Sequence, residues 1–285
     1  MPSADAHAHL FADGFRGVLG GPPVGSDELS QYERLRRHHV IERTLVIGYE
    51  GERRYHGNND YVLALAQTLP WIAPMAYLPI SPTPTVDDLL SLQARGALGF
   101  AIYLPGHEDG ATFADWPSET LRELRSQRAI LSLNAPPPAT SAAAEIIRAL
   151  DECPVLMSHL GLPGRFARVP SLEDVRRHLK PLLALSQFEH VRVKLSGLYA
   201  ISDPPHGFPH AAAKPFVQAL LDAFTPARLL WGSDFSAALD FVSFAQTTDP
   251  QMLDDCSAAE AEAVMGGNLL RLLAARHLGD CGTTE

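Results

Sequence analysis

Eight short runs of apolar residues recur along the 285-residue chain, and longer segments with helical periodicity separate them. The runs are rich in Val, Ile, Leu and aromatic residues without strict alternation, which is typical of parallel strands covered on both faces. We predict strands over residues 4–9, 43–49, 71–77, 98–103, 129–134, 154–159, 190–196 and 228–233. Eight strands that alternate with helices in one chain of this length predict an α/β fold, a (β/α)8 TIM barrel.

Capping signals mark the starts of several of the intervening helices. A hydroxyl residue stands three positions before an acid, the spacing of a capping box, in three places: Thr85 before Asp88, Ser171 before Asp174 and Ser257 before Glu260. No change of composition marks a domain boundary. We therefore predict a single barrel domain over residues 1–278 and a disordered tail over residues 279–285.

The composition narrows the class of protein. Hydrophobic residues make up 46% of the chain and charged residues 20%, which describes an ordinary soluble globular protein. The net charge of −10 argues against nucleic acid as a partner. We find neither a signal peptide nor an apolar run long enough to cross a bilayer, so we expect no membrane association and a cytoplasmic location. The expected partner is a small-molecule substrate, and the sequence also permits a homo-oligomer.

The first predicted strand carries two histidines separated by one residue. Alternate residues of a strand lie on one face, so we expect His7, His9 and also Asp5 to point the same way. Neutral imidazole is the commonest metal ligand in proteins. The pair can therefore reach one metal ion or one polarised substrate oxygen.

A third histidine and an acid stand at the ends of two other predicted strands. His159 ends the sixth strand and Asp234 follows the eighth, and the C-terminal ends of barrel strands meet at one mouth. We predict that they join His7 and His9 as ligands of a divalent metal, with zinc preferred and one position open for water. Asp234 would then act as general base towards the attacking water. Without a metal, the histidines would polarise a carbonyl by hydrogen bonding, and the sequence leaves both versions open.

Further polar residues follow the same strand ends. Arg165 and Arg168, in the loop after His159, are candidates to bind a substrate carboxylate. Tyr199 is a candidate donor to an oxyanion. Lys194 and Ser196 share one face of their strand, so either both or neither should point inward.

The motifs resemble those of the amidohydrolase superfamily, and more narrowly its amidohydrolase-2 branch of TIM-barrel metal-dependent hydrolases. The matching segments are Asp-Ala-His-Ala-His-Leu-Phe at 5–11, Ser-His-Leu-Gly at 158–161, Val-Lys-Leu-Ser-Gly at 193–197, Leu-Trp-Gly-Ser-Asp-Phe at 230–235 and Gly-Asn-Leu-Leu-Arg-Leu at 267–272. The Val-Lys-Leu-Ser-Gly segment is most similar to the lactonase group, which includes 2-pyrone-4,6-dicarboxylate lactonase and sugar-acid lactonases.

The resemblance implies a hydrolase that opens a lactone, or a related ester or amide. Asp234 would be the general base, and His7, His9 and His159 would bind a metal or polarise the carbonyl. The decarboxylases of the branch use zinc, whereas the pyrone dicarboxylate lactonase is thought to work without a metal. Catalytic roles are thus expected for Asp234, His159 and Tyr199.

Some positions depart from the patterns of the branch. Leu98 and Ala101 stand where the dicarboxylate lactonases have arginines. Asn134 ends its strand where those enzymes have a histidine. The expected pocket, with Tyr103, Asn134 and Tyr199, is less cationic and more aromatic than a dicarboxylate site. We therefore expect a less charged lactone or an aromatic-derived substrate.

Two alternatives accompany the hydrolase. One is a lyase on the same scaffold, a zinc-dependent decarboxylase or hydratase, although a histidine that the decarboxylases carry near position 199 is replaced here by Tyr199. The other is a catalytically silent barrel that binds a ligand or partner, because the same scaffold supports many functions.

Overall fold

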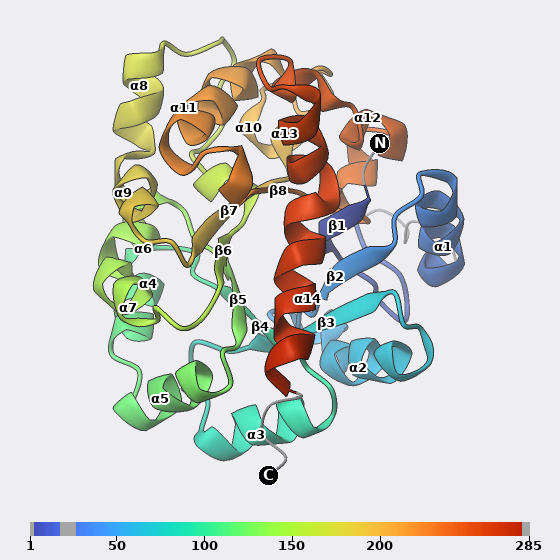
Figure 1. Cartoon of the computed structure of the whole chain (residues 1–285), viewed down its shortest axis with the longest axis vertical. Helices are drawn as coiled ribbons and strands as arrows, with labels where there is room; N and C mark the ends of the chain where they lie inside the picture. The colour runs from blue at the N-terminus through green and yellow to red at the C-terminus, as the bar shows by residue number, and fades with distance from the viewer. Residues whose placement is uncertain (1–2, 18–26, 281–285) are drawn as a thin grey trace.

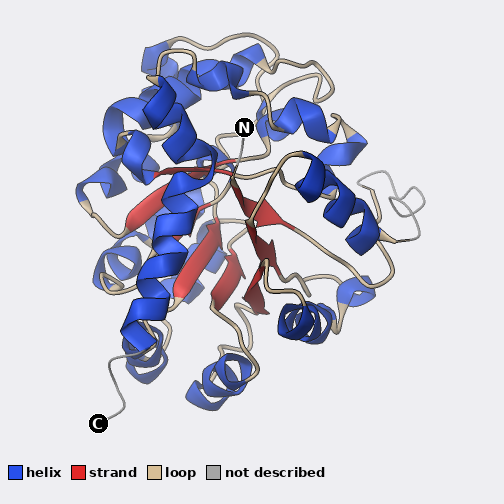
Figure 2. Ribbon diagram, turned by 45° about the vertical axis from the view of Figure 1, so that its right-hand side comes forward, coloured by secondary structure: helices blue, strands red, loops and turns tan. Residues whose placement is uncertain are grey.

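A computed structural model describes residues 3–17 and 27–280 of the chain. Eight parallel strands lie in chain order in a single sheet, and helices surround them (Figure 2). The strands are β1 (Ala4–Ala8), β2 (Arg43–Ile47), β3 (Ile72–Leu78), β4 (Gly99–Tyr103), β5 (Ile130–Asn134), β6 (Val155–Met157), β7 (Val191–Leu195) and β8 (Leu229–Trp231). The predicted (β/α)8 barrel is confirmed, and each predicted strand matches an observed one with ends that shift by one or two residues.

The barrel closes where the first strand meets the segment after the last one. Ala8 and Phe235 form an isolated parallel bridge. The backbone N–H of Asp234 donates to the carbonyl of His7 at 2.8 Å, and the N–H of His9 donates to the carbonyl of Phe235. This seam places the residues after β1 directly beside those after β8.

The helices form an outer layer around the strands (Figure 1). The α-helices are α1 (Glu28–His38), α2 (Asn58–Thr68), α3 (Val86–Ala94), α4 (His107–Ala114), α5 (Ser118–Ser126), α6 (Pro137–Ala142), α7 (Ala144–Ala149), α8 (Leu172–His178), α9 (Lys180–Ala184), α10 (Leu198–Ile201), α11 (Lys214–Phe224), α12 (Phe244–Thr247), α13 (Ala258–Glu262) and α14 (Asn268–Asp280). Short 3-10 turns are η1 (Arg53–Tyr55), η2 (His159–Gly161), η3 (Leu185–Gln187), η4 (Ala211–Ala213), η5 (Pro226–Arg228), η6 (Ala237–Asp240) and η7 (Pro250–Leu253), and the π-turn η8 (Ala263–Gly267) precedes α14.

The helix starts follow the capping signals of the sequence. Thr85 and Ser257 form complete capping boxes with Asp88 and Glu260. The Ser171 hydroxyl accepts the backbone N–H of Asp174 at the start of α8. Helix α14 continues to Asp280, two residues into the segment expected to be a disordered tail, and residues 281–285 lie outside the described part. None of the described helices combines the length and apolar character that a membrane span needs.

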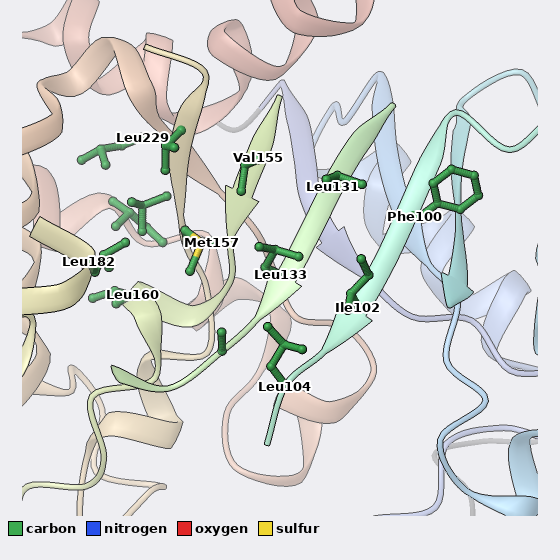
Figure 3. Packing of buried hydrophobic residues seen from close by; sticks show 14 of the residues in the cluster. Phe100, Ile102, Leu104, Leu131, Leu133, Val155, Met157, Leu160, Leu182 and Leu229 are labelled. Atoms are coloured by element: carbon green, nitrogen blue, oxygen red, sulfur yellow. The ribbon is translucent and has the colours of Figure 1, made fainter. Parts of the chain in front are cut away.

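Alternate residues of each strand supply two apolar layers. Side chains such as Ile102, Leu131, Leu133 and Met157 pack outward against the helices (Figure 3). Their neighbours point into the barrel, where Leu269, Leu272 and Leu273 of α14 join them: this inner group includes Ala4, Ala6, Leu45, Ile47, Met75, Ala101, Ile130, Leu156 and Leu230. Helix α14, which crosses the strands in Figure 1, therefore closes one end of the barrel. The polar residues remain at the other end, where the strands finish.

Strand β1 contains a β-bulge, which corrects the prediction for Asp5. Asp5 pairs with Thr44 and Ala8 pairs with Val46, so β1 contains one more residue than β2 between these two pairs. The extra residue turns His7 into the barrel, whereas the Asp5 carboxylate faces Tyr32 of α1 and accepts its hydroxyl at 2.8 Å. Asp5 does not share the face of His7 and His9, because a bulge breaks the alternation on which that expectation depended.

Candidate active site

The two histidines of the first strand meet beside the seam of the barrel. Their Nε2 atoms lie 3.2 Å apart. The Nδ1 atom of His9 contacts the carbonyl of Ile47 at 2.8 Å, and because a carbonyl only accepts, Nδ1 carries the proton and Nε2 offers a lone pair. His7 is buried and His9 is half-buried. The His9 ring is therefore held by the Ile47 carbonyl with its Nε2 lone pair facing Nε2 of His7.

Asp234 brings a carboxylate to the same point from the end of β8. Its oxygens lie 3.7 Å from Nε2 of His7 and 3.9 Å from Nδ1 of His159. The Tyr199 hydroxyl donates to the carboxylate at 2.7 Å. Asp234 has a left-handed backbone with φ of 57°, which is uncommon for a residue with a side chain and is typical of sites where a fixed orientation matters.

His159 lies in the turn η2 that follows β6. Its ring centroid lies 4.6 Å from that of His7, and its Nδ1 is 3.0 Å from the hydroxyl of Ser196. His159 also has a positive φ, 52°. The structure thus brings His7, His9, His159, Asp234 and Tyr199 close together.

Two glycines make this close approach feasible. A Cβ atom on Gly197, whose φ is +63°, would lie 2.7 Å from Nδ1 of His159 and 3.4 Å from an oxygen of Asp234. A Cβ atom on Gly232 would lie 2.8 Å from Cβ of His7. The glycines in the Ser-Gly and Trp-Gly-Ser-Asp segments are therefore required by packing against the polar cluster.

Lys194 is a site residue for which the sequence predicts no role. Its side chain is buried inside the barrel, and Nζ lies 3.2 Å from Nδ1 of His7 and 2.7 Å from the hydroxyl of Ser132. Ser196 is also buried against His159, so both residues of the pair point inward. The signal that could have revealed Lys194 is a lysine close to the C-terminal end of a strand, where the chemistry of a barrel lies.

Lys194, His7 and His9 can form a chain of hydrogen bonds in which each side chain donates to the next. As an ammonium group, Lys194 donates to Nδ1 of His7, whose Nε2–H then donates to Nε2 of His9. His9 in turn donates to the carbonyl of Ile47. In this arrangement both nitrogens of each imidazole are satisfied.

Burial dominates the protonation of the cluster. Desolvation raises the pKa of Asp234 to about 6, against the opposing effects of His9 and the Tyr199 hydrogen bond. It lowers the pKa of His9 and of His159 to about 4. At neutral pH the imidazoles are therefore neutral, the form that ligates metals, and Asp234 is an ionised base.

The donor set fits a divalent metal ion. One ring nitrogen each of His7 and His9 and a carboxylate oxygen of Asp234 all lie within 4.8 Å of one another. Two nitrogens bound to tetrahedral zinc are roughly 3.3 Å apart, close to the spacing between these imidazoles. His7 would have to place its proton on Nδ1 and Lys194 would have to accept it as a neutral amine, and burial lowers the pKa of Lys194 to about 7. His159 lies outside this three-residue group.

A cleft of about 350 Å³ opens next to His9. Tyr103, predicted to bind substrate, lines it, and its ring centroid lies 4.8 Å from that of Tyr49. The three other predicted substrate-binding residues are elsewhere: Asn134 ends β5 beside Tyr103 without lining the cleft, and Arg165 and Arg168 are exposed in the loop after η2. The aromatic and arginine side chains that do line the cleft come mainly from the loops after β1 and β2. The pattern of strands in the sequence does not indicate the path of a loop, so these residues were not predicted.

The barrel and its cluster together define a class of enzyme. A parallel (β/α)8 barrel with a His-x-His pair from the first strand and an acid after the last holds its chemistry at the C-terminal ends of the strands. The sequence matches the amidohydrolase family model over residues 4–274. The chain belongs to the amidohydrolase family, in its amidohydrolase-2 branch, and the predicted membership is confirmed. It is an enzyme of the amidohydrolase superfamily.

Solved structures share the fold at low sequence identity. An amidohydrolase from Burkholderia multivorans with bound zinc is 20% identical, with 96% of this chain and 99% of that chain covered and a TM-score of 0.75. A probable 2-pyrone-4,6-dicarboxylic acid hydrolase from Acinetobacter baumannii with citric acid bound is 18% identical, with 96% and 100% covered and a TM-score of 0.71. A 4-oxalomesaconate hydratase from Rhodopseudomonas palustris is 13% identical, with 98% of each chain covered and a TM-score of 0.59. Among proteins of curated function, none matches this sequence.

Proposed function

We propose that this enzyme hydrolyses a lactone, or a related carboxylic ester or amide, of a small molecule. The observation that carries the proposal is the convergence of a buried carboxylate, a phenol and neutral imidazoles beside a cleft. Asp234 accepts the Tyr199 hydroxyl at 2.7 Å and lies 3.7 Å from His7 Nε2. A base, a hydrogen-bond donor and carbonyl-polarising groups are the components that water attack on an acyl carbon needs.

In the proposed reaction, Asp234 takes a proton from the attacking water. A carboxylate whose pKa is raised to about 6 holds that proton long enough to return it to the leaving alkoxide. The Tyr199 hydroxyl keeps the carboxylate oriented. His159 lies between Ser196 and Asp234, where its imidazole can donate to the carbonyl oxygen of the substrate.

His7, His9 and Asp234 are the residues that would hold a divalent ion, with zinc the preferred choice. When bound, such an ion supplies Lewis-acid polarisation of the carbonyl and a lowered pKa of water. Without it, the hydrogen-bonded histidines supply the polarisation. The zinc-bound relative from Burkholderia multivorans supports the first version.

The direct test is acid release from a panel of γ- and δ-lactones by the wild-type enzyme and by Asp234→Asn. We expect the variant to lose at least about a thousandfold in kcat/KM, because the general base is removed. Asp87→Asn, an exposed acid in the first turn of α3, is the matched control and should retain full activity. Hydrolysis that persists in Asp234→Asn would contradict the assignment. Carbon dioxide release or hydration instead of acid production would favour the lyase alternative.

A further inference from the structure

The cleft beside His9 has a composition that points to a particular kind of ligand. Five aromatic side chains line it together with His9, two arginines, one acid and an alanine. The aromatic residues are Phe11, Phe15, Tyr49, Tyr55 and Tyr103. His9 is the member of the histidine and aspartate cluster that reaches this cleft, so one end of the cleft is the reactive end.

The aromatic rings form a continuous wall. The ring centroids of Phe11 and Tyr55 lie 4.2 Å apart, and those of Tyr49 and Tyr55 lie 5.8 Å apart. At the reactive end, Phe11 stacks on His9 with centroids 5.8 Å apart and an interplanar angle of 9°. Rings of this kind pack best against a flat, unsaturated partner, which can stack on one face or meet an edge.

The two arginines of the cleft differ in their partners. The guanidinium of Arg54 forms an ion pair with Glu52 at 2.5 Å and lies over the ring of Tyr55, so its charge is compensated. Within the described ranges, Arg16 forms no ion pair with an acid. The described lining of the cleft therefore carries two guanidinium groups and one carboxylate, and Arg16 is the guanidinium outside the ion pair.

The position of Arg16 is fixed through its backbone. Its N–H donates to the Tyr55 hydroxyl at 3.1 Å, and the preceding N–H of Phe15 donates to the buried carboxylate of Glu28 at 2.5 Å. Arg16 and Arg54 also border an adjoining cavity of about 210 Å³, which His9 does not line. Arg16 thus borders both the reactive cleft and the adjoining cavity, which Asp13 also lines.

We propose that the cleft binds a planar, conjugated ring that bears a single anionic group, with the ring stacked on the aromatic wall and the anion paired with Arg16. The inference rests on the proposed function only in taking the His9 end as the place where the acyl carbon sits. A guanidinium recognises a carboxylate through paired N–H donors, and one such cation suits one anionic group. A dianionic substrate would leave its second charge without a partner in this cleft.

Ligand binding, rather than turnover, tests the proposal. The probes are coumarin-3-carboxylate, which is flat and carries one negative charge, and its neutral carboxamide. Binding is measured by titration calorimetry on Asp234→Asn, in which the proposed hydrolysis is removed, and on the wild type at low temperature. We expect the carboxylate to bind about tenfold more tightly than the carboxamide, as one solvent-accessible charged contact warrants.

The decisive variant is Arg16→Gln. It should weaken binding of the carboxylate about tenfold and leave that of the carboxamide within about twofold. Arg122→Gln, an exposed arginine of α5 outside the cleft, is the matched control and should change neither. Cyclohexanecarboxylate should bind more weakly than benzoate if the wall selects flat rings.

Equal affinity for carboxylate and carboxamide, an unchanged affinity in Arg16→Gln, or no binding of either probe would overturn the inference. These outcomes are separate from those of the hydrolysis assay. Charge-selective binding by a protein that opens no lactone would leave the ligand class standing and remove the proposed reaction. Lactone hydrolysis without charge-selective binding would support the proposed reaction and overturn the ligand class.

Discussion

Gly197 leaves the space that the His159 ring occupies, because it has no side chain. Its φ of +63° and the 2.7 Å approach that a Cβ atom would make to His159 combine two separate costs, backbone strain and crowding. We expect Gly197→Ala to destabilise the protein by about 2–3 kcal/mol and to lower kcat/KM at least about tenfold, because His159 must move. Chemical denaturation and steady-state kinetics measure the two effects.

The control for Gly197 is another glycine with a positive φ. Gly96 has a φ of +102°, but a Cβ atom on it would meet nothing within 4 Å, and it lies between α3 and β4, far from the mouth. Gly96→Ala should cost about 1 kcal/mol with unchanged activity. An equal loss of activity in both variants would contradict the crowding of His159.

Asp234 links stability to pH. Because burial raises the pKa of its carboxyl to about 6 from 3.8, the folded state holds the proton more tightly than the unfolded state does. Ionised Asp234 therefore costs stability above about pH 6, and this cost disappears as the pH falls below about 4. We expect Asp234→Asn to be more stable than the wild type by about 1–3 kcal/mol at pH 8, with a gain that shrinks towards pH 4.

Denaturant unfolding at a series of pH values measures this difference. Asp87→Asn, the exposed control of the activity assay, should show no comparable gain at pH 8. A wild type more stable than Asp234→Asn at pH 8 would show that partners of the carboxylate outweigh its desolvation.

At the scale of elements, the bulge in β1 and the seam with β8 depend on one buried carboxylate. Asp5 accepts four hydrogen bonds: from the N–H of His7 at 3.0 Å, the hydroxyl of Tyr32 at 2.8 Å, the N–H of Ser233 at 2.9 Å and the hydroxyl of Ser233 at 2.5 Å. These bonds connect β1 to α1 and to the end of β8. Asp5 is thus a structural organiser of the strand that carries both histidines.

We expect Asp5→Ala to destabilise the protein by about 3 kcal/mol or more, because buried donors lose their acceptor. It should also lower kcat/KM strongly, since His7 would no longer be held by the bulge. Thermal unfolding and kinetics on the folded fraction measure the two effects. Tyr32→Phe removes one of the four donors and should cost about 1 kcal/mol with activity retained. Full activity in folded Asp5→Ala would contradict this role.

The strands and the convergence of the cluster could be predicted from the sequence because both follow from chain order. Buried parallel strands produce the apolar runs, and the topology of the barrel brings the residues after each strand to one mouth. The bulge at Asp5 could not be predicted, since it depends on pairing with β2 and on contacts with Ser233 from the other end of the chain. Lys194 and Arg16 were missed for a similar reason: the first depends on which way a strand residue faces, and the second on the path of a loop.

At the scale of the whole molecule, the site joins the two ends of the fold. The contact between Asp5 and Ser233 spans 228 positions in the chain. The histidines belong to the first strand, and the carboxylate follows the last, so no fragment that lacks either end contains the cluster. Catalytic competence therefore requires β8 to be docked against β1. Enzymatic turnover would thus detect only molecules whose barrel is closed. Partly folded forms would show no activity, however much native helix and strand they contained.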